Sequence, residues 1–318
     1  MVKLYDNTGY GYIEVEVEQF YFNDSPAFFA KTGKDSYLRD FTEPFYTVPK
    51  MIFGSMPRDG GHLIIEAADY DDFIAREPKA EKWIRPFVGA REFLHNEKRY
   101  CLWLEDCPPN EIKAMPLVYQ RVKNVREFRL ASKAESTRKF AKTPWLFCQN
   151  AQPKTNYLLV PRVSSERRDY VPIGYMDANV ICSDANHMVP GAMYWHFGVL
   201  TSLPHMVWMR MVCGRLKSDY RYSAQIVYNN FPFPPFWREV ERTAAEILVA
   251  RQNYPEASFA DLYDPLLMPK DLRKAHEQND RAVMAAYDFP KNMTEEQMQR
   301  AFMRMYDSLR NMEELLGW

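Results

Sequence analysis

The sequence predicts an α+β fold, with a mixed, sheet-containing body up to about residue 234 and an all-helical region after it. Short apolar runs alternate with turn signals through the first part of the chain, whereas apolar residues recur at helical spacing from about residue 235. Hydrophobic residues make up 47% of the 318 residues and aromatic residues 15%, which excludes a disordered chain.

The strands and helices of the body are expected to be short. Residues 10–17 alternate polar and apolar side chains, as a half-buried strand does. Residues 51–54 and 62–65 flank a Pro-Arg-Asp-Gly-Gly turn, which predicts a strand, a loop and a second strand. The remaining predictions are a short helix over 71–82, a basic helical segment within 119–142, and strands over 157–163 and 170–175.

The last third of the chain is predicted to form helices over 237–250, 269–287 and 294–316, the last opened by a Thr-Glu-Glu-Gln capping box. The apolar stretch 188–213 is interrupted by prolines, histidines and an arginine, so we expect a buried core and not a membrane span. The apolar positions of the tail that we expect to be buried include Ile247, Leu248, Leu262, Leu266, Leu272, Phe302, Met305 and Leu309.

Charge and cysteine content restrict the function classes. There are 41 Lys and Arg against 42 Asp and Glu, a net charge of -1, which excludes a protein that binds nucleic acid by bulk charge. Residues 113–142 are an exception, with nine basic and two acidic side chains. The five cysteines contain no CxxC pair, which argues against a zinc ribbon, and free thiols suit a reducing cytoplasm.

Catalytic motifs are not found in the sequence. It has no P-loop, GxSxG or HExxH motif, and an apolar strand follows Asp59-Gly60-Gly61, which indicates a tight turn and not a phosphate loop. Phe233-Pro234-Pro235-Phe236 has the shape of the xPPF motif of adenine methyltransferases, but Phe233 cannot accept a hydrogen bond from a flipped adenine. An FxGxG loop for S-adenosylmethionine is missing too. We therefore expect no catalytic residue, metal or cofactor in this chain.

Ten distinctive segments follow one another in a fixed order. They are FGSMPRDGGHL from residue 53, IRPFVG from 84, RYCLWL from 99, VPRVSSERR from 160, WMR from 208, GRLKS from 214, RYS from 221, VYNNFP from 227, DLYDP from 261 and KAH from 274. In this order they resemble the C-terminal part of MmeI-like, type IIL restriction–modification proteins.

The resemblance implies a domain organisation and a partner. Proteins of this family join a nuclease, a helical spacer, an adenine-specific methyltransferase, a target recognition domain and a helical tail in one chain. Here 45–234 would be the DNA target recognition domain, 235–318 the helical C-terminal domain, and 1–44 a linker or a remnant of the methyltransferase domain. The expected partners are double-stranded DNA and a methyltransferase domain or subunit, which would bind S-adenosylmethionine in the parent enzyme.

The resemblance also implies which side chains read bases. The family segment Gly-Arg-Leu-x-Ser-x-x-Arg-Tyr-Ser places two variable readers on Lys217 and Asp219, with Arg221 beside them. A second reading position falls on Asp184 and Ala185. Lys can donate to guanine O6 and N7, and Asp can accept from cytosine N4, so the first two residues could read one G·C pair. The alternative is an exposed ion pair of little energetic value.

Phosphate contacts are expected from basic residues outside the reading segments, and they would set the register on the duplex. The alternative is an ordinary solvated helix face. The candidates are the basic run 113–142, in particular Arg138 and Lys139, together with Arg162, Arg167 and Arg168. For the whole chain, two other functions stay open at this point: part of an active methyltransferase assembled with a partner chain, and a protein-interaction scaffold whose helical tail docks a partner.

Overall fold

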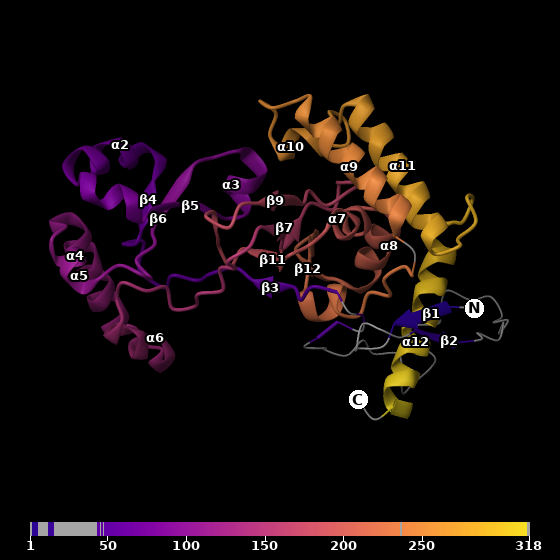
Figure 1. Ribbon diagram of the computed structural model, residues 1–318, viewed down its shortest axis with the longest axis horizontal. Helices are drawn as coiled ribbons and strands as arrows, with labels where there is room; N and C mark the ends of the chain where they lie inside the picture. Colours follow the sequence, from indigo (N-terminus) through magenta and orange to yellow (C-terminus); the bar gives the residue numbers. More distant parts are fainter. Residues whose placement is uncertain are drawn as a thin grey trace.

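Two lobes with separate hydrophobic cores make up the structure, a computed structural model (Figure 1). It describes residues 2–5, 12–15, 43, 44, 46, 48–235 and 237–316. Most of the segment 1–44, expected to be a linker, lies outside the described residues. Within it, β1 (Val2–Tyr5) and β2 (Tyr12–Val15) pair as antiparallel strands.

The smaller lobe is inserted between two strands of the larger one, β3 (Ile52–Phe53) and β7 (Tyr157–Pro161). Its sheet has the order β10-β5-β6-β4, and only β10, which pairs with β5, is parallel to its neighbour. These strands are β4 (Ile64–Glu66), β5 (Ile84–Val88), β6 (Arg99–Leu102) and β10 (Ile181–Cys182).

The helices of the smaller lobe form its outer side, except for α3 (Ala90–His95), which lies toward the larger lobe (Figure 1). The helix expected over 71–82 is in fact an α-helix followed by a 3-10 helix, Pro78–Trp83, which begins at a proline. Two further helices begin at prolines, whose missing N–H has no helical partner at that position anyway. The α-helices are α2 (Ala67–Arg76), α3 (Ala90–His95), α4 (Pro109–Lys113), α5 (Pro116–Leu130) and α6 (Glu135–Lys139).

The larger lobe contains an antiparallel sheet of order β3-β11-β7-β9, with β9 at Gly174–Met176 and β11 at Asn186–Pro190. All five residues of β7 are buried, which explains their continuous apolar sequence. Of the strand expected over 170–175, only the last two residues are in a strand. Tyr170 instead points into the core and donates its hydroxyl hydrogen bond to Asp280 at 2.6 Å.

A second, three-stranded sheet of order β12-β13-β8 extends from the same lobe. Its strands are β8 (Val163–Ser164), β12 (Gly214–Leu216) and β13 (Asp219–Arg221). A single π-helical turn, Ala224–Tyr228, follows β13 and returns the chain to the core.

The apolar stretch 188–213 is core, as predicted. It forms α7 (Tyr194–Leu200) and α8 (Leu203–Val212), whose side chains are largely buried. Its histidines are neutral core residues: burial lowers the pKa of His196 to about 4 and that of His205 to about 3. No helix among the described residues is both long and apolar enough to cross a bilayer.

The C-terminal region consists of α9 (Arg238–Gln252), α10 (Phe259–Leu262), α11 (Lys270–Ala286) and α12 (Glu295–Leu316). It packs on α7 at Gly198, where a Cβ would lie 2.8 Å from Val240 Cγ1 and 2.9 Å from the Ala244 Cβ. Asn279 of α11 bonds to both helices at this contact. Its Nδ2 donates to Gly198 O at 2.7 Å, and its Oδ1 accepts from Thr243 Oγ1 at 3.0 Å.

Burial in this region follows the helical periodicity with one exception. Ile247, Leu262, Leu272, Phe302 and Leu309 are buried, and Leu248 and Met305 are partly buried against the same core. The prediction for Leu266 is wrong, since it is 84% exposed. It lies in the loop between α10 and α11, where its N–H bonds to Asp264 Oδ1 at 2.8 Å and helical spacing no longer decides its direction.

The buried guanidinium of Arg129 joins two segments of the smaller lobe by hydrogen bonds. It is 0% exposed and donates to five backbone carbonyl oxygens, those of Pro57, Arg58, Phe140, Thr143 and Leu146, at 2.7–3.1 Å. These acceptors come from two loops that are far apart in sequence from each other. One side chain of α5 therefore stabilises the loop that follows β3 and the segment that leads back to the larger lobe.

We predict that Arg129→Met destabilises the protein by at least about 3 kcal/mol, because it leaves buried carbonyl groups without donors. Urea unfolding followed by circular dichroism measures this loss. The matched control is Arg126→Met, one turn earlier on α5 and exposed, which should change the free energy of unfolding by less than about 0.5 kcal/mol. Equal effects of the two changes would contradict a structural role of Arg129.

Candidate nucleic-acid interface

The β12–β13 hairpin carries three of the predicted base readers. Leu216 pairs with Asp219, so Lys217 and Ser218 form a two-residue turn. Lys217 has φ +56°, in the left-handed region, whereas Ser218 is not among the described residues with positive φ. Glycine normally fills such a position, so the lysine adopts a strained backbone in an exposed turn. Strain at an exposed residue is typical of functional positions.

The two faces of the hairpin have different surroundings. Side chains alternate along a strand, so Leu216, Asp219 and Arg221 lie on one face and Arg215 and Tyr220 on the other. The second face is tied down: the Arg215 guanidinium lies 4.1 Å from the centre of the Tyr220 ring and donates to the Ser218 carbonyl at 2.9 Å. Arg215 therefore stabilises the turn from the face opposite Leu216, Asp219 and Arg221.

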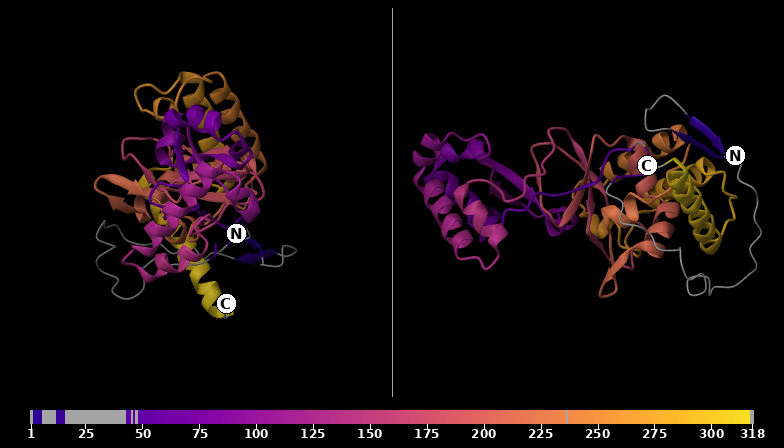
Figure 2. Two further views of the ribbon diagram at one scale, coloured as in Figure 1. Left: turned by 90° about the vertical axis from the view of Figure 1, so that its left-hand side faces the viewer. Right: turned by 90° about the horizontal axis from the view of Figure 1, so that it is seen from below.

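The first face is open to solvent, because Arg221 is exposed and Asp219 only partly buried. Figure 2 shows this hairpin extending from the body of the larger lobe.

The structure brings the second predicted reading position next to this hairpin. Asp184 and Ala185 form the connection between β10 and β11. The Arg162 N–H donates to Ala185 O at 3.3 Å, and the Tyr222 N–H donates to Arg162 O at 2.8 Å. Two segments that the sequence separates by more than thirty residues therefore lie on either side of Arg162.

The Arg162 side chain takes part in the same arrangement. Its Nη1 donates to the Asp184 carbonyl at 2.8 Å, and its guanidinium lies 5.0 Å from the centre of the Phe53 ring. Phe53 is 42% exposed, and its other neighbour is the His187 ring at 4.8 Å. Sequence reasoning missed Phe53, whose signal was a bulky aromatic residue at the start of a distinctive segment. Arg162, for which we expect a phosphate contact, lies between the two segments that are predicted to read bases.

His187 connects this group to the core. Burial lowers its pKa to about 4, so the ring is neutral, and its Nε2 lies 3.3 Å from the Tyr222 carbonyl. With the proton on Nε2 it donates to that carbonyl. The Tyr222 hydroxyl in turn lies 2.9 Å from Nε2 of His205. The base of the hairpin is thus anchored by buried polar contacts.

Arg167 and Arg168 follow β8 and differ in burial. Arg167 is exposed, as a phosphate contact requires, whereas Arg168 is partly buried. Burial lowers the Arg168 pKa, and the carboxylates of Asp219 and Asp264 act in the opposite direction. Arg168 is therefore within electrostatic reach of a predicted base reader. Asp264 belongs to the α10–α11 loop, so the helical region also lies near this face.

The remaining predicted phosphate contacts, Arg138 and Lys139, lie on α6 of the smaller lobe. Figure 2 shows α6 and the β12–β13 hairpin on the same side of the molecule. Arg138 also donates to the Ser132 and Lys133 carbonyls, both at 2.8 Å, and Lys139 lies 3.2 Å from Glu135. Both side chains are exposed.

The basic run 113–142 is not one continuous binding face. Arg129 is buried, so the expectation that it contacts phosphate is wrong. Arg121 is partly buried, and its Nη1 donates to the His62 and Ile64 carbonyls at 3.0 Å each. Both side chains of α5 thus bond to backbone carbonyls of the smaller lobe: Arg121 at the start of β4, and Arg129 in the loop that follows β3. The basic side chains of this run that are exposed are Lys113, Lys123, Arg126, Lys133, Arg138, Lys139 and Lys142.

The Asp59-Gly60-Gly61 loop is a turn, as predicted. The buried Asp59 carboxylate accepts from the Gly61 N–H at 3.1 Å and from the Leu63 N–H at 2.6 Å. The Gly61 and Leu63 amides therefore bond to the Asp59 side chain and are not free to bind a phosphate. Among the described residues, no group of three or more His, Cys, Asp or Glu side chains is arranged to hold a metal ion.

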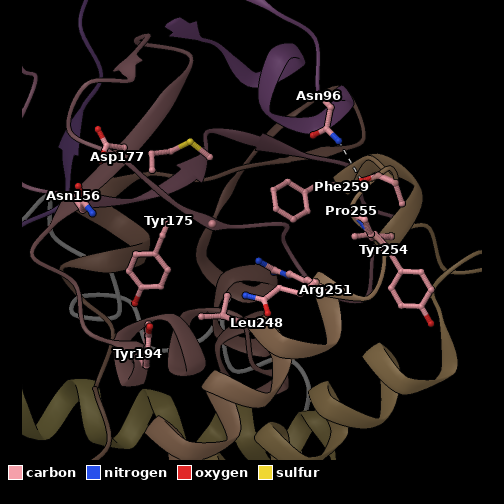
Figure 3. Close-up of a pocket in the computed structure, with 15 residues that line it drawn as sticks. Asn96, Asn156, Tyr175, Asp177, Tyr194, Leu248, Arg251, Tyr254, Pro255 and Phe259 are labelled. Atoms are coloured by element: carbon pink, nitrogen blue, oxygen red, sulfur yellow. Dashed lines mark hydrogen bonds between the residues drawn. The ribbon is translucent and has the colours of Figure 1, made fainter.

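A cavity of about 700 Å³ lies elsewhere, where α3, β9 and the α9–α10 connection meet (Figure 3). Asn96 of the smaller lobe donates across it to Ala257 O at 3.2 Å. Arg251 lines the cavity, but it donates to Ile173 O and to the Tyr263 hydroxyl, both at 2.8 Å. The cavity thus marks a junction between the smaller lobe and the helical region.

Comparisons with known proteins confirm the resemblance. The family model of the MmeI target recognition domain matches residues 32–235, and that of the MmeI C-terminal domain matches residues 237–313. DNA methyltransferase A of Bacillus subtilis (strain 168) is 36% identical over 293 residues, which are 88% of this chain and 33% of that protein. The solved structure of the type IIL restriction-modification enzyme MmeI in complex with DNA has a TM-score of 0.83 at 44% identity, over 86% of this chain and 37% of that one.

The chain therefore spans about a third of the length of these two relatives.

We predict that Lys217→Gly stabilises the protein by about 0.5–1 kcal/mol, because glycine adopts positive φ without the steric cost that lysine has. Thermal unfolding measures the change. The matched control is Ser218→Gly at the neighbouring turn position, which should destabilise by about 0.5–1 kcal/mol because only the unfolded chain gains freedom. A stability loss in Lys217→Gly as large as in the control would show that the turn is not strained.

Proposed function

The chain belongs to the MmeI family of target recognition and C-terminal domains, and from this membership we propose that it reads a DNA sequence for a larger methyltransferase or restriction–modification enzyme. One observation carries the proposal. The two segments expected to read bases lie on either side of Arg162, and one of them forms an exposed hairpin.

A hairpin of this kind suits the major groove of double-stranded DNA, which is about 12 Å wide and admits a two-stranded ribbon. In the proposal, Lys217 donates to guanine and Asp219 accepts from cytosine N4 of the same base pair. Arg221, on the face of Asp219, donates to a purine. Ala185 is exposed and small, so it leaves room for a base edge beside Arg221.

Phosphate contacts flank these readers in the proposal. Arg167 lies beyond β8, and Arg138 and Lys139 lie on α6 at the same side of the molecule (Figure 2). Contacts from both lobes would fix the register of the duplex, because phosphate binding positions a protein without reading sequence. Arg168 also belongs to this set in the proposal, although it is only partly buried and not fully exposed.

Methyl transfer belongs, in this proposal, to the part of the longer protein that lies outside these 318 residues. The Phe233 ring supports this division: it is 3% exposed and packs edge-on against Phe231 at 5.0 Å and Tyr228 at 5.5 Å. A side chain so placed holds the core together and does not face a flipped base. S-adenosylmethionine would accordingly bind to the methyltransferase partner, on which the helical region would dock.

We predict that the paired exchange Lys217→Glu with Asp219→Arg inverts one position of the preferred sequence from G·C to C·G. The exchange swaps donor and acceptor across one base pair, and each single change should cost about 1–3 kcal/mol of discrimination. Selection from a random duplex library with the 318-residue chain measures the preference. An unchanged preference, or its loss at several positions together, would show that other residues read the bases.

We also predict that Lys139→Gln with Arg167→Gln weakens binding to all sequences alike. Removing two phosphate contacts should reduce the slope of log affinity against log salt by about 1.8. Titrations of a labelled duplex between low and physiological salt measure this slope. Lys291→Gln is the matched control, since Lys291 is exposed in the α11–α12 connection. A slope that stays the same in the double variant would mean that these two residues are merely solvated.

A further inference from the structure

Leu216 is an apolar side chain on the hairpin face that also carries Asp219 and Arg221. It ends β12, is 53% exposed, and directly precedes Lys217 at the turn. It belongs to none of the hydrophobic clusters of the described residues. Its neighbours on the same face, the partly buried Asp219 and the exposed Arg221, are predicted base readers.

The hairpin cannot easily turn Leu216 inward. A slip of one residue in strand pairing would move every side chain to the opposite face. That slip is opposed by Arg215, which bonds to the turn carbonyl of Ser218 at 2.9 Å, stacks on Tyr220 and approaches Glu166 at 3.9 Å. Leu216 is therefore held on the reading face.

We propose that Leu216 contacts the 5-methyl group of a thymine in the base pair next to the one read by Asp219. This inference rests on the proposed function. Directly opposed residues of a hairpin have Cβ atoms about 5 Å apart, and stacked base pairs are about 3.4 Å apart, so the two side chains reach neighbouring pairs. The thymine methyl is the one large apolar group on the major-groove edge of the bases, where the nitrogen and oxygen atoms donate or accept hydrogen bonds.

A wedge between stacked bases fits the same side chain less well. Leu216 stands opposite Asp219, and insertion into the stack would bring that carboxylate against base faces that offer it no donor. Contact at the groove edge leaves Asp219 beside exocyclic amino groups, which donate hydrogen bonds. The geometry of the pair therefore favours a methyl contact in the groove.

Uracil scanning tests the inference with the 318-residue chain. In the duplex that this chain selects, each thymine is replaced in turn by uracil, which lacks only the methyl group. The unmodified chain should lose about fourfold in affinity at one position, the value of one buried methyl group. For the Leu216→Ala variant, the thymine and uracil duplexes should bind equally well at that position. For the Leu216→Met variant, the uracil duplex should still bind more weakly, by less than fourfold.

Leu267→Ala is the matched control, because Leu267 is also exposed, at 65%, but lies in the α10–α11 loop; it should show the same uracil sensitivity as the unmodified chain. Thermal unfolding checks that each variant is folded.

The possible results separate the inference from the function on which it rests. If no position shows an effect that depends on Leu216, while the Lys217 and Asp219 exchange still changes one base preference, the inference is overturned and the proposed function stands. If Leu216→Ala weakens thymine and uracil duplexes equally, Leu216 is a wedge and the inference is overturned as well. If the folded chain selects no sequence at all, both fail.

Discussion

The backbone of Arg162 holds the candidate interface together, because it bonds on one side to Ala185 and on the other to Tyr222. Neither neighbouring segment is long enough to hold itself in place: β13 has three residues and β10 has two. Backbone hydrogen bonds to Arg162, the residue between β7 and β8, fix both segments relative to each other, and the hydroxyl of the buried Tyr222 lies 2.9 Å from Nε2 of His205 in the core. Specific reading of bases needs this kind of rigid support, since a side chain placed loosely cannot discriminate between similar groove edges.

Arginine has two separate tasks in this protein, and burial distinguishes them. Arg129 and Arg251 satisfy backbone carbonyls and tyrosine hydroxyls in the interior, where they join loops that are distant in sequence. Arg167 and Arg221 are exposed on the side of the hairpin. The net charge of -1 therefore does not distinguish the arginines that work in the interior from those that face solvent.

The helical region packs directly on the body of the larger lobe. Gly198 lets α7 approach α9 so closely that Asn279 can bond to the Gly198 carbonyl, and Tyr170 bonds to Asp280 of α11. Burial raises the pKa of Asp280 to about 6, so this carboxyl lies well inside the contact. The same region supplies Asp264, whose charge acts on Arg168 near the hairpin. The boundary between body and tail is thus a packed interface and not a flexible connection.

The sequence by itself determined the α+β class, the buried stretch 188–213, the helices of the tail and the family, because periodicity and ordered segments are local properties of the chain. It also indicated Lys217, Asp219 and Arg221 through the family segment, and their role as readers stays a prediction. Only the tertiary structure showed that Asp184 and Ala185 lie beside that segment, that Arg129 is buried and that Leu216 and Leu266 are exposed. Strand pairing and loop packing decide these points, and they depend on contacts between residues far apart in sequence that no local pattern encodes.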